Sequence, residues 1–500
     1  MARIIIMKFI RIDIEKERKK EMQQKYQSER LGIEPIPKLL KNLSVPAMVG
    51  MFVMALYNIV DTIFISYAVG ISAVAGLTIS FPVIMIIMAV SVAMGMGGAS
   101  VISRLLGAQK EKEANQVFGN IITMIIFVSI IGAIAAFTIL EPMLILFGAT
   151  PDILGYSVDY MFPILLGTFL FSFGFATNAI VRSEGNAKLS MNIMIISSVL
   201  NIILDAIFIF GFNMGVRGAA YASVLSQGVI SVIFLHYFLT GKSSLSLRIA
   251  DLAPKYKIIK EVFAIGLPGF MQQAAGGIMV VSINTMLIRF GSEFHVGLFG
   301  IVQRISMFML MPLVGIMQGM QPLVGYNFGA NKFTRLKETV WIGLKVSTLL
   351  STIIFIIMMI FPKYFMMIFT SDAEVIKSGT DAIRILFATA FFIGVPVVCG
   401  GIFQALGKVK LALILSMSRQ LLFLIPLVLI LPHFFGVNGV WMAFPISDAL
   451  SFGLAAFLLY RNRDLILRDD DLTVETETEA LLPVKENTVI GEPLAKSSEA

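Results

Sequence analysis

Two aspartates of this sequence stand inside long apolar stretches. Asp205 lies in the run SVLNIILDAIFIF, four residues after Asn201. In the first apolar stretch, Asp61 follows Asn58 by three residues. On a helix, residues three or four apart share one face. A carboxylate at bilayer depth costs roughly 2.5–3.5 kcal/mol on insertion scales, so such groups normally face a cavity and bind something. Both pairs therefore indicate an ion site; the alternative for each is a carboxyl group neutralised by a hydrogen bond to a neighbouring helix.

The composition places these aspartates in a membrane. Of the 500 residues, 57% are hydrophobic and 14% are charged, and the mean hydropathy is +0.86. Apolar runs of 20 or more residues recur about twelve times, each long enough to cross a hydrocarbon core of roughly 30 Å as a helix. Strand alternation is absent, so we expect an all-α polytopic membrane protein with twelve transmembrane helices. The expected spans are residues 45–69, 75–100, 118–140, 155–181, 189–211, 219–240, 259–288, 297–322, 339–361, 379–405, 411–432 and 438–460.

The basic residues indicate the orientation of the helices. The net charge is +7. With both termini in the cytosol, fifteen Lys and Arg residues fall in short cytosolic loops and four in outer loops. This bias predicts a multi-pass protein of the plasma (inner) membrane with cytosolic termini. Residues 1–40 are expected to be a basic cytosolic tail and residues 462–500 a disordered acidic tail. Because topology explains the scattered positive charge, no nucleic acid partner is expected.

The two halves of the sequence repeat at an offset of 222 residues. Corresponding pairs include Pro46 and Pro268, Gly107 and Gly329, and Gly185 and Gly407. An even number of spans per repeat predicts two six-helix lobes related by a pseudo-two-fold axis along the membrane normal. The N-lobe is expected at 41–240 and the C-lobe at 259–461, with a cytosolic linker at 241–258. The acids are not duplicated, because Ile283 and Leu427 stand at the positions that correspond to Asp61 and Asp205.

Depth in the membrane brings further oxygen-bearing residues to the same level. Asp61 and Asp205 each lie sixteen residues from the expected cytosolic start of their spans, roughly 24 Å along a helix. Tyr160 and Ser223 fall in the same outer third. Carboxylate, amide and hydroxyl oxygens suit a hard cation such as Na⁺, and a buried carboxyl group also exchanges protons. The candidate cation site for Na⁺ or H⁺ therefore consists of Asp61, Asn201, Asp205, Ser223, Tyr160 and Asn58.

The chain resembles the multidrug and toxic compound extrusion (MATE) family of cation-coupled exporters over roughly residues 38–461. The resemblance is carried by YNIVDTIFIS (57–66), RLLGAQKEKEA, AIVRSEGNAKLSM (179–191), VLNIILDAIFIFGFNMGVRGAAYAS (199–223) and QPLVGYNFGANK (321–332). In the branch that it resembles, the cation site lies in the N-terminal lobe, at residues that match Asp61, Tyr160, Asn201, Asp205 and, conservatively, Ser223. Another branch uses acids in spans seven and ten. That site is not expected here, because Glu261 and Asp381 lie near the ends of those spans.

Other residues are assigned weaker expectations. Asn178, Met54 and Tyr57 are the candidates for lining a substrate cavity, although the family pattern often has a polar residue in place of Met54. Pro46 is expected in the first turn of span one, where proline is tolerated, or as a hinge that moves Asp61.

Two arginines also lie deep in spans. Arg419 in span eleven and Asp448 in span twelve come at comparable depth and are expected to neutralise each other. Arg304 in span eight is expected to line the cleft, pair with an acid or extend its charged end towards water.

These expectations favour a secondary antiporter that exports amphipathic, cationic organic compounds or drugs in exchange for Na⁺ or H⁺ by alternating access. The alternative is a lipid-linked oligosaccharide flippase of the same superfamily, with Arg304 and Arg419 as its candidate arginines, or a cation channel. No enzyme, cofactor or resident metal is indicated, since the three His residues lack ligand spacing. The expected partners are small organic substrates and membrane lipid, and the protein is expected to be a monomer.

Overall fold

The computed structural model describes residues 28–68 and 71–467, and this part of the chain contains helices and no strand. Ten of its helices are long and apolar enough to cross a membrane, and two bent helix pairs bring the number to twelve if each pair is one span. The all-α membrane fold expected from the sequence is confirmed. Most of the two predicted tails, residues 1–27 and 468–500, lies outside the described residues.

The first half of the chain forms the N-lobe. After the short 3₁₀ turn η1 (Arg30–Gly32), its elements are α2 (Ile36–Ala68), α3 (Ile71–Gly107), α4 (Glu111–Thr138), α5 (Leu140–Leu146), α6 (Pro151–Leu166), α7 (Thr168–Ser183), α8 (Ala187–Asp205), the π-helix η2 (Ala206–Gly211) and α9 (Gly215–Leu239).

The second half forms the C-lobe. After the short 3₁₀ turn η3 (Ile249–Leu252), its elements are α10 (Tyr256–Phe290), α11 (Glu293–Gly329), α12 (Phe333–Ile360), α13 (Pro362–Met367), α14 (Ala373–Leu386), η4 (Ala390–Phe392), α15 (Gly394–Ala405), α16 (Val409–Met417), the π-helix η5 (Ser418–Leu424), α17 (Ile425–Ile430), α18 (Pro432–Phe435), α19 (Val437–Arg461) and η6 (Arg463–Leu465).

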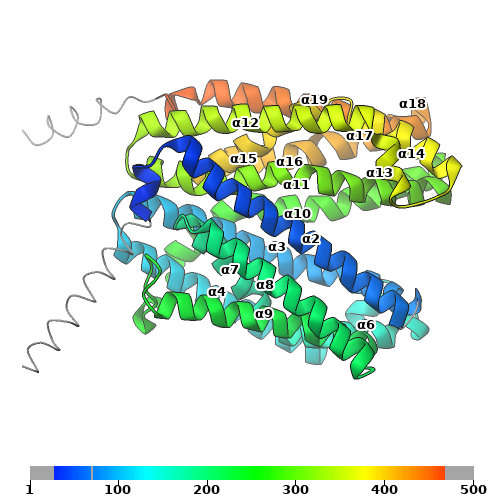
Figure 1. The fold of residues 1–500 in the computed structure, drawn as a ribbon, viewed down its shortest axis with the longest axis horizontal. Helices are drawn as coiled ribbons and strands as arrows, with labels where there is room; N and C mark the ends of the chain where they lie inside the picture. The colour runs from blue at the N-terminus through cyan, green and yellow to red at the C-terminus, as the bar shows by residue number, and fades with distance from the viewer. Residues whose placement is uncertain (1–27, 69–70, 468–500) are drawn as a thin grey trace, which may run out of the picture.

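The two lobes lie side by side and diverge along their length (Figure 1). The first and last described residues lie at the same end of the molecule, which we call the terminal end. There the lobes adjoin, whereas towards α6 and α14 they are further apart. The helix α2 runs between the lobes and packs on both α8 of the N-lobe and α11 of the C-lobe. The helix α3 likewise packs on α10 and α11.

Buried apolar side chains explain this arrangement. One cluster draws on both lobes and includes Leu39, Phe118 and Leu323. A second cluster belongs to the C-lobe alone, around Phe299. The third belongs to the N-lobe alone, around Val216. Because helices in a bilayer associate mainly through close van der Waals packing, these clusters show that the lobes are held together at the terminal end and that each lobe has its own core elsewhere.

The helix α2 begins nine residues before the start predicted for span one. Its first turns bury Ile36, Leu39, Leu40 and Leu43, the spacing of one helical face. Lys38 and Lys41 on the opposite face lower the mean hydropathy, so the sequence predicts a tail up to residue 40 and the start of span one only at residue 45. Pro46 consequently lies inside the helix, and its expected place in the first turn is wrong.

Two spans that were predicted as continuous are bent. Span four consists of α6 and α7, which meet at 58°, and span ten of α14 and the segment from Ala390 to Ala405, which meet at 44°. Pro163 lies in the last turn of α6, where proline removes a backbone hydrogen bond and favours a kink. The α6–α7 bend sets the direction of the segment that carries Tyr160.

Candidate functional site

Asp61 and Asp205 come together in the N-lobe. Asp61 lies on α2 and Asp205 is the last residue of α8, and these helices pack on each other. Their side chains are 7% and 0% exposed. The two carboxyl groups interact electrostatically with each other, and both interact with Tyr160 of α6, which is also buried. The structure therefore places three predicted site residues from three helices in one neighbourhood.

Asn201 and Ser223 extend this neighbourhood to α9. The Asn201 side chain is 2% exposed, and its Nδ2 donates to Ser223 Oγ at 3.4 Å. The described residues provide no hydrogen-bond donor for Asn201 Oδ1, Asp61 Oδ1 or either carboxyl oxygen of Asp205. All four atoms are acceptors, so only a proton donor or a cation satisfies them. This donor set has the chemistry of a site for H⁺ or a hard cation.

The remaining candidates on α2 lie beside the site. Tyr57 interacts electrostatically with Tyr160, and both Tyr57 and Met54 are partly buried. The side chain of Asn58, the sixth predicted member of the cation site, lies outside the described residues. Tyr57 therefore lies near Tyr160, which interacts with both acids.

A π-helix follows Asp205 directly. Six residues, the segment η2, are wound more widely than the α-helix before them. Such π-bulges occur frequently at functional sites. No sequence signal announced this change of winding, because the run AIFIFG is apolar throughout.

Within the described part of the chain, Asn178 forms hydrogen bonds with Arg182 and Ser190 and not with the predicted members of the cation site. Its Oδ1 accepts a short hydrogen bond from Arg182, and its Nδ2 donates to the carbonyl of Ser190 at 3.4 Å. Arg182, rather than Asn178, lines a small cavity between α3, α7 and α11, together with Gln318 and Gln321. Asn178 thus orients an arginine at the boundary between the lobes.

The C-lobe has a buried aspartate that is paired with an arginine. Arg419 Nε lies 2.6 Å from Asp448 Oδ1, and the carbonyl of Arg419 accepts a hydrogen bond from Ser447 at 2.6 Å. The expected neutralisation of Arg419 by Asp448 is confirmed. Arg304 is exposed.

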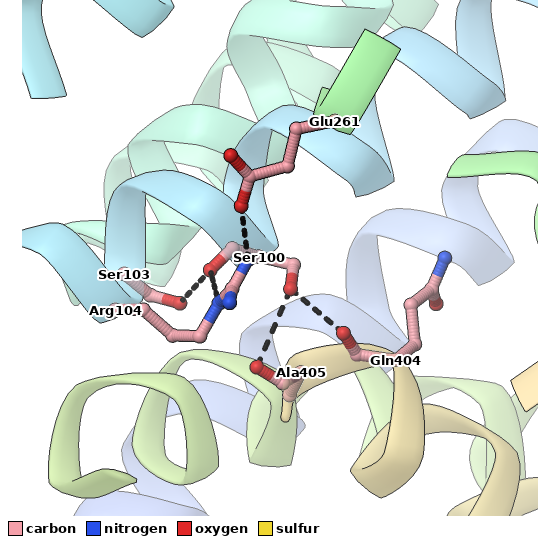
Figure 2. Close-up of polar contacts among 6 residues, drawn as sticks. All are labelled: Ser100, Ser103, Arg104, Glu261, Gln404 and Ala405. Carbon is pink, nitrogen blue, oxygen red and sulfur yellow. Dashed lines mark hydrogen bonds and ion pairs between the residues drawn. The ribbon is translucent and has the colours of Figure 1, made fainter. Parts of the chain in front are cut away.

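A seal of close contacts joins the lobes at the terminal end, and the sequence reading missed it. In Figure 2, Arg104 of α3 reaches Glu261 of α10 at 3.2 Å, and Ser100 Oγ donates to the carbonyl of Gln404 at 2.7 Å. A Cβ atom at Gly97 would lie 2.0 Å from the carbonyl oxygen of Val262. Only glycine permits this approach of α3 to α10. From the sequence, Arg104 is one of the fifteen basic residues expected in cytosolic loops, where it indicates topology and not a contact.

Two helical lobes, a buried acidic site in one of them and a seal at one end are the architecture of a secondary transporter. A family model described as MatE matches residues 46–207 and again residues 268–430. The second match starts 222 residues after the first, which is the offset of the sequence repeat. The chain belongs to the MatE family, whose members are transporters and not enzymes.

Individual relatives are similar over nearly their whole length. "Multidrug export protein MepA" of Staphylococcus haemolyticus is 26% identical over 440 residues, 88% of this chain and 97% of that protein. The protein of the same name from Staphylococcus aureus (strain N315) is 27% identical over 445 residues, again covering 88% and 97%.

Two solved structures connect the fold to named transporters. The structure of "MATE multidrug transporter DinF-BH", solved as a complex with a small organic ligand, is 60% identical, with a TM-score of 0.82, and covers 89% of this chain and 99% of that one. "Outward-facing conformation of a multidrug resistance MATE family transporter of the MOP superfamily" is 28% identical, with a TM-score of 0.80, and covers 88% and 99%.

Proposed function

We propose that this protein exports amphipathic, cationic organic compounds and that Na⁺ or H⁺ entering through the N-lobe acids drives the export. The observation that carries the proposal is the set of buried acceptor oxygens on Asp61, Asn201 and Asp205, for which the described residues provide no donor. An ion that binds there changes the charge inside the N-lobe. A ligand that binds one arrangement of the lobes better than another shifts the population towards it.

The substrate class is supported by the relatives. The Staphylococcus proteins are named multidrug export proteins, and the structure that is 60% identical is a multidrug transporter with a small organic ligand bound. We infer the same class of small organic substrate for this chain. One chain suffices for the proposed site, since all its residues come from the N-lobe of a single molecule.

We further propose that the terminal end faces the cytosol and that the protein resides in the plasma membrane. The distribution of Lys and Arg in the loops supports this orientation. The sealed terminal end then corresponds to a transporter closed towards the cytosol, in keeping with the similarity to a structure described as outward-facing.

The test is ethidium transport by the purified protein in liposomes, with a Na⁺ gradient and a pH gradient imposed separately. Ethidium is a fluorescent probe of the proposed class, since it is both cationic and aromatic. We expect one gradient to drive transport in the wild type. Asp61→Asn and Asp205→Asn should reduce the driven transport to the level of liposomes without protein, because an amide no longer exchanges the charge that couples the ion.

Asp152→Asn is the matched control, since Asp152 is an exposed aspartate in the first turn of α6. Its transport should equal that of the wild type. Full gradient-driven transport in both Asp61→Asn and Asp205→Asn contradicts the proposal.

A further inference from the structure

The first residues of the described chain lie between the two lobes at the terminal end. The segment 28–35 comprises η1 and the residues that lead into α2. Leu31 has no exposed surface and belongs to the apolar cluster that both lobes share. A segment expected to be a solvated tail is thus part of the packed molecule.

The C-lobe holds the backbone of this segment. Four consecutive carbonyl groups, from Leu31 to Glu34, accept hydrogen bonds from side chains at the corner between α11 and α12. The bonds run from Asn327 to Leu31 (3.2 Å), from Lys332 to Gly32 (3.0 Å), and from Arg335 to Leu31 (3.3 Å), Ile33 (3.5 Å) and Glu34 (2.6 Å).

The donors at this corner are themselves positioned. Asn327 has no exposed surface, and its Oδ1 accepts from Arg335 Nε at 3.2 Å. The planar guanidinium of Arg335 therefore bonds Asn327 and the segment at the same time, a geometry that lysine cannot reproduce. These residues belong to the motif QPLVGYNFGANK and the helix start that follows it, to which the proposed ion site assigns no role.

Gly32 shows how closely the segment approaches the C-lobe. A Cβ atom there would lie 2.8 Å from the ring of Tyr326 and 3.0 Å from Lys332 Nζ. The Tyr326 ring is itself buried. The backbone of the segment therefore lies directly on the α11–α12 corner.

The side chain of Arg30 in η1 binds a turn of the N-lobe. Arg30 Nη2 donates to the carbonyl of Gly185 at 2.5 Å. Gly185 lies in the turn between α7 and α8 and has a φ of +91°. The neighbouring Glu184 is fixed in this turn by hydrogen bonds from Tyr237 Oη and from the backbone N–H of Leu245. The segment thus connects an ordered turn of one lobe to an ordered corner of the other.

We propose that residues 28–35 form a strap that holds the terminal ends of the two lobes together and that the Arg30–Gly185 hydrogen bond breaks when these ends separate. The strap stays with the C-lobe, because five hydrogen bonds from three side chains hold it there. This inference rests on the proposed function, in which the lobes alternate between two arrangements during transport. In this proposal, the strap sets the equilibrium between the arrangement with the terminal end closed and the arrangement with it open.

The test is the distance between spin labels on the two lobes, measured by double electron–electron resonance in lipid nanodiscs. Labelled cysteines replace Lys112 at the start of α4 and Lys410 at the start of α16, both exposed. The native Cys399 is fully buried. Arg30→Ala should raise the ratio of long to short distances about tenfold, the effect of losing one charge-assisted hydrogen bond. Arg335→Ala removes three of the five hydrogen bonds between the C-lobe and the strap and should raise the ratio at least as much.

Lys337→Ala is the matched control, because Lys337 is an exposed basic residue two positions after Arg335 on α12. It should leave the distances unchanged. Arg335→Lys keeps the charge but not the planar set of donors, and an intermediate ratio is expected. Thermal unfolding of each variant verifies that it folds.

Unchanged distances in folded Arg30→Ala and Arg335→Ala overturn the strap, whatever transport they support. If these variants open the terminal end while Asp61→Asn retains driven ethidium transport, the strap stands and the proposed coupling site fails. Reduced unfolding temperature without a change in distances means that the segment only stabilises the fold, and this also overturns the proposal.

Discussion

Asp205 differs from Asp159 and Asp372 in what surrounds its carboxyl oxygen atoms. Asp159 pairs with Arg217 at 2.9 Å, and Asp372 accepts hydrogen bonds from two backbone N–H groups at the start of α14. Those carboxylates are satisfied by the protein itself. Asp205 is fully buried, and neither of its oxygens has a donor among the described residues. A buried carboxyl group without a donor is unfavourable unless it binds a proton or a cation, as the proposed ion site requires.

Glu184 is another buried carboxyl group, outside the membrane-spanning segments. Ser243 donates a short hydrogen bond to it, and Tyr237 Oη donates at 2.9 Å. Burial raises the pKa of Glu184 from 4.5 to about 7, and the hydrogen bonds oppose this rise. Because the pKa is higher in the folded than in the unfolded chain, its stabilising contribution is complete below pH 4.5. It is lost as the pH rises through about 7.

Replacing Glu184 by Gln should remove this dependence on pH. The free energy of unfolding of the wild type, relative to Glu184→Gln, should fall by up to about 3 kcal/mol between about pH 4.5 and about pH 8. Unfolding in detergent at a series of pH values measures the difference. Glu338→Gln, at an exposed position of α12, should show no such trend, and a flat difference for Glu184→Gln would contradict the prediction.

At the scale of helices, the sequence predicted which segments cross the membrane but not how they end or bend. Hydropathy identified α2 but missed its first nine residues, since Lys38 and Lys41 alternate with the buried apolar face. Pro163 marks a place where span four can bend, but the angle of that bend and the winding of the π-helices depend on packing between helices, which a single sequence pattern does not contain. Asp61 and Asp205 could be chosen from the sequence as candidates because an ionisable side chain inside an apolar helix is costly and is usually retained for a function. The polar contacts of the seal were not predictable, because their residues also suit a solvated helix end.

The packing of α3 on α10 allows the two kinds of contact in the seal to be compared. The side chains of Arg104 and Glu261 are 21% and 48% exposed, and a pair at such a position contributes at most about 1 kcal/mol. Gly97, in contrast, has the carbonyl of Val262 in the place of its side chain. Backbone contact, rather than the ion pair, should hold the seal.

We therefore expect Gly97→Ala to open the terminal end far more than Glu261→Gln does. The labelled positions 112 and 410 provide the measurement. Gly277→Ala on α10 is the matched control, because a Cβ atom there meets nothing within 4 Å. Equal distance distributions for Gly97→Ala and the control would show that the seal does not depend on this contact.

Across the whole molecule, the fold is repeated in both lobes, but the pair of buried aspartates is present in one lobe only. Both halves have the same order of helices, and each half matches the family model. Asp61 and Asp205, however, have no acidic counterparts in the C-lobe, where Ile283 and Leu427 stand at the corresponding positions. The repeated sequence predicted the two lobes, but it did not indicate which end is closed. That depends on contacts between lobes that have no counterpart within either repeat.

This asymmetry predicts opposite results for buried charges in the two lobes. Asp448 is almost fully buried, and Arg419 is its ion-pair partner. Removing one member of a buried pair commonly costs about 3–5 kcal/mol, whereas replacing both by apolar residues is often neutral. Arg419→Met should therefore lower the unfolding temperature, and the double variant Arg419→Met/Asp448→Leu should recover it and retain gradient-driven ethidium transport. Asp61→Asn should fold but not transport. A stable double variant without transport would instead assign the C-lobe pair a part in coupling.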